Sequence, residues 1–240
     1  MKSIFALILL SVFLSACNSK IQTKIDNTVQ YVEDVKETIA PIPTKILSDG
    51  LPNKHQITTA FIPQAPEKNW DQPWQDACEE ASILTVHYYY QNQTPDLPTL
   101  LKDYQTLFSL SSVHDINLSQ MANYSQQLYR YKPTIINNPD TEIIKKYVSQ
   151  NIPVIITANG KTLFKENKRF KSGGPWYHSL VILGYDDNIS KFIVHDVGTQ
   201  FGAYYKYSYS LLMDSIHDLP ANGNKEQIDS GDKKILVLVK

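Results

Sequence analysis

The alternation of apolar and polar positions divides the chain into a helical first part and a strand-rich second part. Apolar residues recur three or four positions apart over 78–90, which predicts a helix that begins near Cys78. Similar patterns predict further helices at 97–109, 118–129 and 141–150, and a short one within 205–216. Compact apolar runs predict strands at 57–62, 154–158, 178–186, 191–196 and 234–239. Helices in front and an antiparallel sheet behind them indicate an α+β fold.

The first 16 residues have the pattern of a targeting signal. One lysine precedes an apolar run from Ile4 to Leu14, which is too short to cross a ~30 Å hydrocarbon core comfortably. The run 14–17, Leu-Ser-Ala-Cys, resembles a bacterial lipobox, in which the cysteine is lipidated and becomes the new N-terminus. We therefore expect a lipoprotein signal peptide at 1–16 and a lipid such as palmitate on Cys17. A plain signal peptide and an uncleaved short anchor are the alternatives.

A lipidated Cys17 would hold the chain on a membrane of the bacterial cell envelope, outside the cytoplasm. Asn18 stands where an aspartate would favour the inner membrane, so an outer membrane is favoured if the cell has two. Residues 17–55 are polar and mixed, and we expect them to form the lipidated N-terminus and a tether. The folded domain is expected to cover 56–240.

Composition and charge exclude several classes of protein. The 240 residues include 23 Lys+Arg and 24 Asp+Glu, so the net charge of -1 gives no electrostatic basis for binding nucleic acid. Nine glycines and the lack of a G-x-G-x-x-G or G-x-x-x-x-G-K-[ST] motif argue against a nucleotide site. Two cysteines cannot form a cysteine-rich zinc site. We therefore expect no cofactor, no metal and no nucleic-acid partner.

Cys78 is the candidate nucleophile. With Cys17 lipidated it would be the one free thiol of an exported protein, and it is either an inert buried side chain or a catalytic one. Its position at a predicted helix start favours chemistry, because backbone N–H groups there stabilise a thiolate. A cysteine nucleophile also needs a base. His87 cannot serve, since nine residues along one helix place it half a turn out of phase and ~13.5 Å away.

His178 is the best candidate base among the six histidines. It begins the predicted strand 178–186, and Asp196 ends the next predicted strand. If these strands form a hairpin, their far ends meet, and His178 and Asp196 lie side by side. His195 is adjacent to Asp196, but neighbours on a strand point to opposite faces. Taken alone, a histidine before an apolar strand is more often structural.

Together these residues resemble a papain-like cysteine peptidase domain, and most closely the bacteriocin-processing, double-glycine type. The matching segments are Gln64, Trp70, 78–82, 176–186 and 194–196. The resemblance covers about 57 to the C-terminus. It implies a papain-like fold, in which an N-terminal helical part that carries the cysteine packs on an antiparallel sheet that carries the histidine and the aspartate.

The resemblance also implies a role for each candidate. Cys78 would be the nucleophile, His178 the base and Asp196 the group that orients it. The side chain of Gln64 and the amide of Cys78 would form the oxyanion hole. Gln72, six residues before Cys78, is the alternative to Gln64.

The implied activity is hydrolysis of peptide or isopeptide bonds in a peptide or protein substrate, through a thioester intermediate. Glu79 departs from the family pattern, which often has glycine after the cysteine, and Glu80 follows it. Two carboxylates beside the thiol would raise its pKa. Two alternatives therefore stay open: a catalytically degenerate binding module at the cell surface, and an acyl or peptidyl transferase that uses the same thioester.

Overall fold

The computed structural model describes residues 50–111 and 115–240. They belong to one compact unit, Leu47–Lys240, and the other unit of the chain is Met1–Ile46. The predicted signal peptide at 1–16, the lipid site at Cys17 and most of the tether at 17–55 lie outside the described residues.

The helices follow the sequence pattern closely. They are α2 (Cys78–Gln91), α3 (Leu97–Phe108), α4 (Leu118–Tyr129), α5 (Thr141–Ser149), α6 (Gly160–Leu163) and α7 (Tyr209–Ser215), with 3₁₀ helices η1 (Trp74–Asp76) and η2 (Lys225–Ser230). The four longer ones confirm the predicted helices. Three of these begin with a side-chain cap: Asp96 caps α3, Asn117 caps α4 and Asp140 caps α5.

One antiparallel sheet contains the strands of the described residues. They are β1 (Lys54–Gln56), β2 (Lys132–Asn137), β3 (Val154–Asn159), β4 (Tyr177–Asp186), β5 (Lys191–His195), β6 (Tyr205–Ser208) and β7 (Lys234–Val239). Their order is β2-β7-β3-β4-β5-β6, and β1 pairs with β4. The α+β class is therefore confirmed, and β4 and β5 form the hairpin that the sequence suggested.

Three strand predictions need correction. The strand predicted at 57–62 is absent; pairing with β4 ends at Gln56, and one further hydrogen bond joins Ile57 N to Leu183 O at 2.7 Å. Strand β1 thus begins at Lys54, two residues before the predicted start of the domain. Strand β2 was not predicted; it contains Pro133, which is tolerated here because β2 lies at the sheet edge. The segment 205–216 holds β6 before its short helix.

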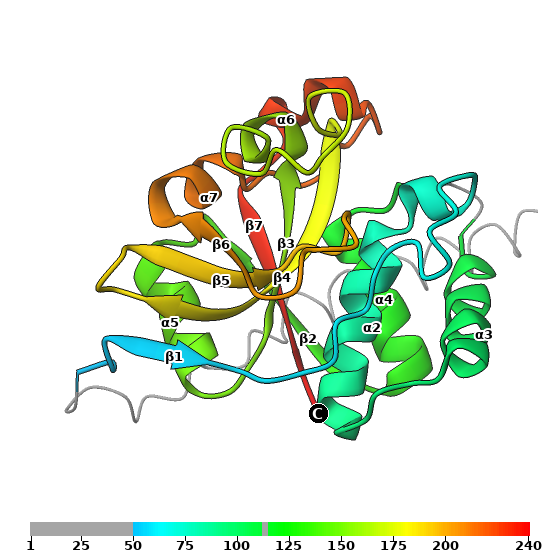
Figure 1. Ribbon diagram of the computed structural model, residues 1–240, viewed down its shortest axis with the longest axis horizontal. Helices are drawn as coiled ribbons and strands as arrows, with labels where there is room; N and C mark the ends of the chain where they lie inside the picture. The colour runs from blue at the N-terminus through cyan, green and yellow to red at the C-terminus, as the bar shows by residue number, and fades with distance from the viewer. Residues whose placement is uncertain (1–49, 112–114) are drawn as a thin grey trace, which may run out of the picture. The chain divides into compact units, whose positions relative to one another are not determined.

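Two largely buried elements bring the candidate site together. Helices α2, α3 and α4 lie together on one side of the sheet, and α2 packs against β4 (Figure 1). Every residue of β4 is buried, as is nearly all of the first three turns of α2. The start of α2 carries Cys78 and the start of β4 carries His178. Among the described residues, no helix is both long and apolar enough to span a bilayer.

Candidate active site

The Cys78 thiol lies where the start of α2 meets the start of β4. Its side chain is buried. The thiol donates a hydrogen bond to Glu79 Oε2 at 3.0 Å and accepts one from the backbone N–H of Ser179 at 3.3 Å. Ser179 directly follows His178, so this contact brings the thiol next to the start of β4, where the candidate base His178 lies.

The start of α2 differs from those of the neighbouring helices. Its N-cap residue is Ala77, which has no side-chain acceptor, whereas α3, α4 and α5 are capped by Asp or Asn. The first N–H groups of a helix have no acceptor within it, and they carry partial positive charge. The backbone at Cys78 can therefore stabilise a negatively charged atom.

His178 and Asp196 form a buried pair. The ring Nε2 of His178 lies 2.9 Å from Asp196 Oδ1. An ionised carboxylate can only accept, so Nε2 carries the hydrogen and Nδ1 is left as the nitrogen that can take a proton. The hairpin argument placed these residues at neighbouring strand ends, and the structure has them in direct contact. Asp196 itself lies just beyond the end of β5.

The second oxygen of Asp196 is also fully used. Oδ2 accepts hydrogen bonds from Asn167 Nδ2 at 2.8 Å and from the Tyr207 hydroxyl at 2.6 Å. Burial alone would raise the pKa of this carboxyl, but His178 and the two hydrogen bonds hold it below the usual value. The carboxylate is therefore ionised and fixed in orientation.

The His178 ring is also held by packing. Phe170 contacts it edge to face, with ring centroids 5.2 Å apart. Gly198 lies against its other atoms: a Cβ added to Gly198 would stand 2.6 Å from His178 Cε1. Only a residue without a side chain leaves room for the ring in this position.

Of the two glutamines considered for the oxyanion hole, Gln64 is buried and Gln72 is exposed. The Gln64 amide nitrogen donates to the carbonyls of Trp74 and Gln75, at 2.9 and 2.7 Å, in the turn that leads to Cys78. Gln72 donates to Asp76 at the surface. Gln64 therefore lies close to the helix start, but both of its amide hydrogens are occupied there.

Two buried carboxyl groups follow the thiol. Burial is the largest cause that raises the pKa of Glu79 well above its usual value, and the charge of Glu80 adds to it. Burial also raises the pKa of Glu80 to about 8. For Cys78, burial, the charge of Glu79 and the hydrogen bond to Glu79 all raise the thiol pKa, and the Ser179 N–H lowers it.

The other histidines lie in different surroundings. Both ring nitrogens of His195 are buried without a hydrogen-bond partner among the described residues, and burial lowers its pKa to about 4. Its ring packs against Phe61 and Tyr204, as expected of a core histidine on the opposite face from Asp196. His87 contacts the Tyr131 hydroxyl at 3.1 Å. His114 lies outside the described residues.

Three residues that support the site were not identified from the sequence. Asn167 belongs to a long loop and Tyr207 to the unexpected strand β6, so nothing in the local pattern linked either to Asp196. Gly198 offers a weak signal, since a glycine two residues after a candidate orienting aspartate can mark a close approach. Among the described residues, no group of three or more His, Cys, Asp and Glu side chains could hold a metal ion.

Several solved structures are similar to this chain in outline. A protein described as a C39-like peptidase from Bacillus anthracis is 15% identical, with a TM-score of 0.49, over 78% of this chain and 98% of that one. Xylellain, a cysteine protease from Xylella fastidiosa, is 14% identical, with a TM-score of 0.39, over 80% and 87%. UfSP from C. elegans is 12% identical, with the same TM-score, over 80% and 35%. No curated protein matches.

The family itself is identified by sequence. The model of the Peptidase_C39 like family matches residues 52–217, which is more than half of the chain and includes Gln64, Cys78, His178 and Asp196. The chain therefore belongs to the Peptidase_C39 like family, and its α+β domain is a cysteine peptidase domain of papain-like fold.

Proposed function

We propose that this protein is a lipid-anchored peptidase of the bacterial cell envelope that hydrolyses peptide or isopeptide bonds with Cys78, His178 and Asp196. The observation that carries the proposal is the buried His178–Asp196 pair at the start of β4, beside a thiol at the uncapped start of α2. The substrate is a peptide or a protein.

The chemistry follows from the positions of these groups. His178 Nδ1 takes the proton of the Cys78 thiol, and the thiolate attacks the carbonyl carbon of the substrate. The C–N bond then breaks, the leaving amine takes the proton from His178, and a thioester remains on Cys78. A water gives a proton to His178 and attacks the thioester, which releases the acid and restores the thiol. Asp196 stabilises the imidazolium in both halves.

The negative oxygen of each tetrahedral intermediate needs hydrogen-bond donors. The backbone N–H of Cys78 at the helix start is one candidate, and the side-chain amide of Gln64 is the second. For Gln64 to donate, one of its hydrogens must leave the carbonyl of Trp74 or Gln75 when substrate enters. Donors in resting sites often align only when substrate binds.

Replacing Cys78 tests the proposal. We expect Cys78→Ala to fold normally and to lose all hydrolysis of an unstructured protein such as casein, measured by mass spectrometry of the products. Cys78→Ser is the matched control for side-chain size. Full activity in Cys78→Ala would overturn the proposal. Products joined to an added amine, in place of cut ones, would indicate the transferase.

A binding module is the second candidate, and one observation favours it. The thiol donates its hydrogen bond to Glu79, and its pKa is raised by burial and by that carboxyl. This candidate would be supported if the wild-type protein and the Cys78→Ala variant bound peptides with the same affinity and the wild-type protein cut none of them.

The anchor and the location rest on the sequence at 14–17. Replacing Cys17 by serine should abolish incorporation of labelled palmitate and release the protein from the membrane fraction. A Cys17→Ser protein that still incorporates labelled palmitate would contradict the proposed lipid anchor.

A further inference from the structure

The Cys78 thiol is hydrogen-bonded to the carboxyl of Glu79. Cys78 Sγ donates to Glu79 Oε2 at 3.0 Å, and among the described residues no hydrogen bond joins this thiol to His178. The His178 Nε2 is already bonded to Asp196. In the resting protein, the transferable proton of Cys78 therefore points to a carboxyl oxygen and not to the proposed base.

Glu79 is held in this position from its other side as well. Its Oε1 accepts the backbone N–H of Ile116 at 3.0 Å, and the side chain has no exposed surface. The carbonyl of Ile116 in turn accepts the Tyr177 hydroxyl at 2.7 Å, which ties the segment to the residue before His178. Both oxygens of this buried carboxyl are hydrogen-bonded, so Glu79 has a fixed place in the candidate site, unlike a solvated acid at a helix start.

Several ionisable groups face this carboxyl: Cys78 and Glu80 on α2, Asp115 before α4 and the hydroxyl of Tyr177 on β4. Burial and the charges of Glu80 and Asp115 raise the pKa of Glu79, whereas its hydrogen bonds to Cys78 and to the Ile116 N–H lower it. The cation nearby is Lys225, which is paired with Asp115 at 2.9 Å and with Asp76 at 3.5 Å. Among the described residues, Lys225 forms ion pairs with these two aspartates and none with Glu79.

We propose that Glu79 is a positioning residue that keeps Cys78 as a protonated thiol, turned from His178, until catalysis begins. This inference rests on the proposed function, in which Cys78 is the nucleophile. At the start of the reaction the Sγ–H group leaves Glu79 Oε2, the S–H bond breaks, and the proton forms an N–H bond at His178 Nδ1. Glu79 ends the step chemically unchanged.

The reason is electrostatic. Cys78 and Glu79 share a 3.0 Å hydrogen bond in the interior, and both burial and this contact with Glu79 raise the thiol pKa, so the ionised form of Cys78 is disfavoured as long as Glu79 stays in contact. Removing the carboxyl while keeping the shape should therefore make the thiol more acidic. A glutamine at 79 retains an oxygen for the Ile116 N–H and can place an N–H group near the sulfur.

The test is the rate at which iodoacetamide alkylates Cys78 in the full chain, followed by mass spectrometry of the peptide that contains it, from pH 5 to 10. We expect Glu79→Gln to react about tenfold faster or more near pH 7, with the midpoint of the pH profile lowered by about one unit or more. Glu80→Gln is the matched control. It removes the neighbouring buried carboxyl that does not touch the thiol, and it should not accelerate the reaction.

An unchanged rate in Glu79→Gln would overturn the proposal, and a slower one would show that Glu79 accepts the thiol proton itself. Glu79→Ala provides a second measurement if Glu79→Gln folds poorly. It also removes the carboxyl from the thiol, so it should alkylate faster than wild type at pH 7. An unchanged rate in this variant would overturn the proposal. Alkylation needs no peptide hydrolysis, so failure of the peptidase assay leaves this result intact.

Discussion

The two halves of the candidate site treat charge in opposite ways. On the sheet side, both oxygens of Asp196 accept hydrogen bonds, and the carboxylate is stabilised next to His178. On the helix side, burial opposes the charge of Cys78, Glu79 and Glu80, and Glu80 Oε2 has no hydrogen-bond partner among the described residues.

This difference indicates which side of the site must change before a thiolate–imidazolium pair can form. The sheet side already holds an ionised carboxylate against His178 Nε2. The helix side must change before a thiolate can exist, since its thiol is held by a carboxyl. We infer that the barrier to forming the thiolate–imidazolium pair lies at the start of α2.

The largest expected effect comes from breaking the sheet side. Asp196→Asn should lower kcat/KM for hydrolysis by about 10²- to 10⁴-fold, because an amide can turn its N–H toward His178 Nε2 and no longer stabilises an imidazolium. Steady-state hydrolysis with active-site titration measures it. Asp186→Asn, which loses only the ion pair to Lys54 at the far end of β4, is the control. Equal activity in both variants would show that Asp196 is not an orienting group.

A smaller effect is expected from moving the ring of His178 without changing any charge. The Cβ of Gly198→Ala would stand 2.6 Å from His178 Cε1, so the ring must shift. We expect a loss of about 10- to 100-fold in kcat with a normal fold, since small displacements of catalytic groups are costly. Gly50→Ala, which meets nothing within 4 Å, is the matched control. Wild-type kcat in Gly198→Ala would mean that the ring position does not limit catalysis.

The fold could be predicted where local rules were obeyed. Helices α3, α4 and α5 begin with Asp or Asn caps before an apolar pattern, and their predicted bounds were nearly correct. The prediction failed where tertiary contacts override the local pattern. The apolar run 57–62 forms no strand, because the pairing with β4 ends at Gln56. Strand β2 forms despite Pro133, because edge strands tolerate proline.

The sequence pointed to the candidate catalytic residues but not to the residues that contact them. Cys78, His178 and Asp196 share an order and spacing that a sequence displays. The contacts of Asn167 and Tyr207 with Asp196 join segments 29 and 11 residues away, and only the fold brings them together. Glu79 was recognised as a possible obstacle, but its hydrogen bonds to Cys78 and Ile116 required the structure.

The smallest expected effect concerns the free energy of unfolding, and it tests the burial of Glu80 on the helix side of the site. Burial raises the pKa of Glu80 from 4.5 to about 8, so between these pH values the folded protein holds a proton that the unfolded chain has lost. The free energy of unfolding therefore falls as pH rises from 4.5 to 8 and then levels off. Glu80→Gln removes this penalty, and it should be more stable than wild type at pH 8 by about 1–3 kcal/mol.

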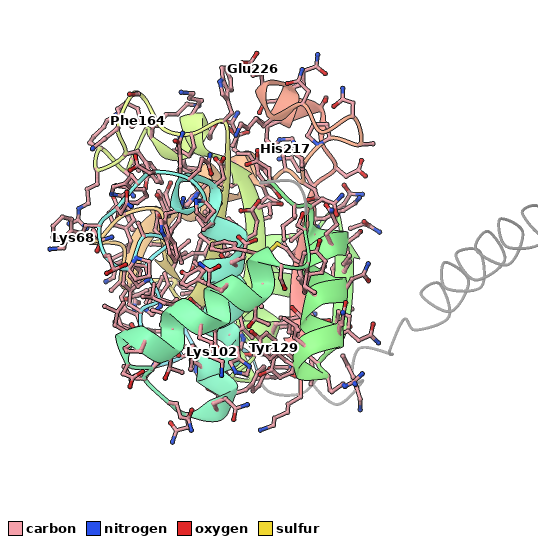
Figure 2. All side chains as sticks on the ribbon, turned by 90° about the vertical axis from the view of Figure 1, so that its right-hand side faces the viewer. Lys68, Lys102, Tyr129, Phe164, His217 and Glu226 are labelled. Carbon is pink, nitrogen blue, oxygen red and sulfur yellow. The ribbon has the colours of Figure 1, made fainter. Side chains whose placement is uncertain are left out.

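Chemical denaturation at pH 4.5, 6 and 8 measures this difference, and its growth with pH is the informative quantity. Glu226→Gln makes the same substitution at an exposed position of η2 (Figure 2), and its stability difference from wild type should stay flat. A Glu80→Gln difference that is also flat would mean that Glu80 is solvated in the folded protein. The helix side would then lose one of the two buried carboxyls that set it apart from the sheet side, and Glu79 alone would oppose the thiolate.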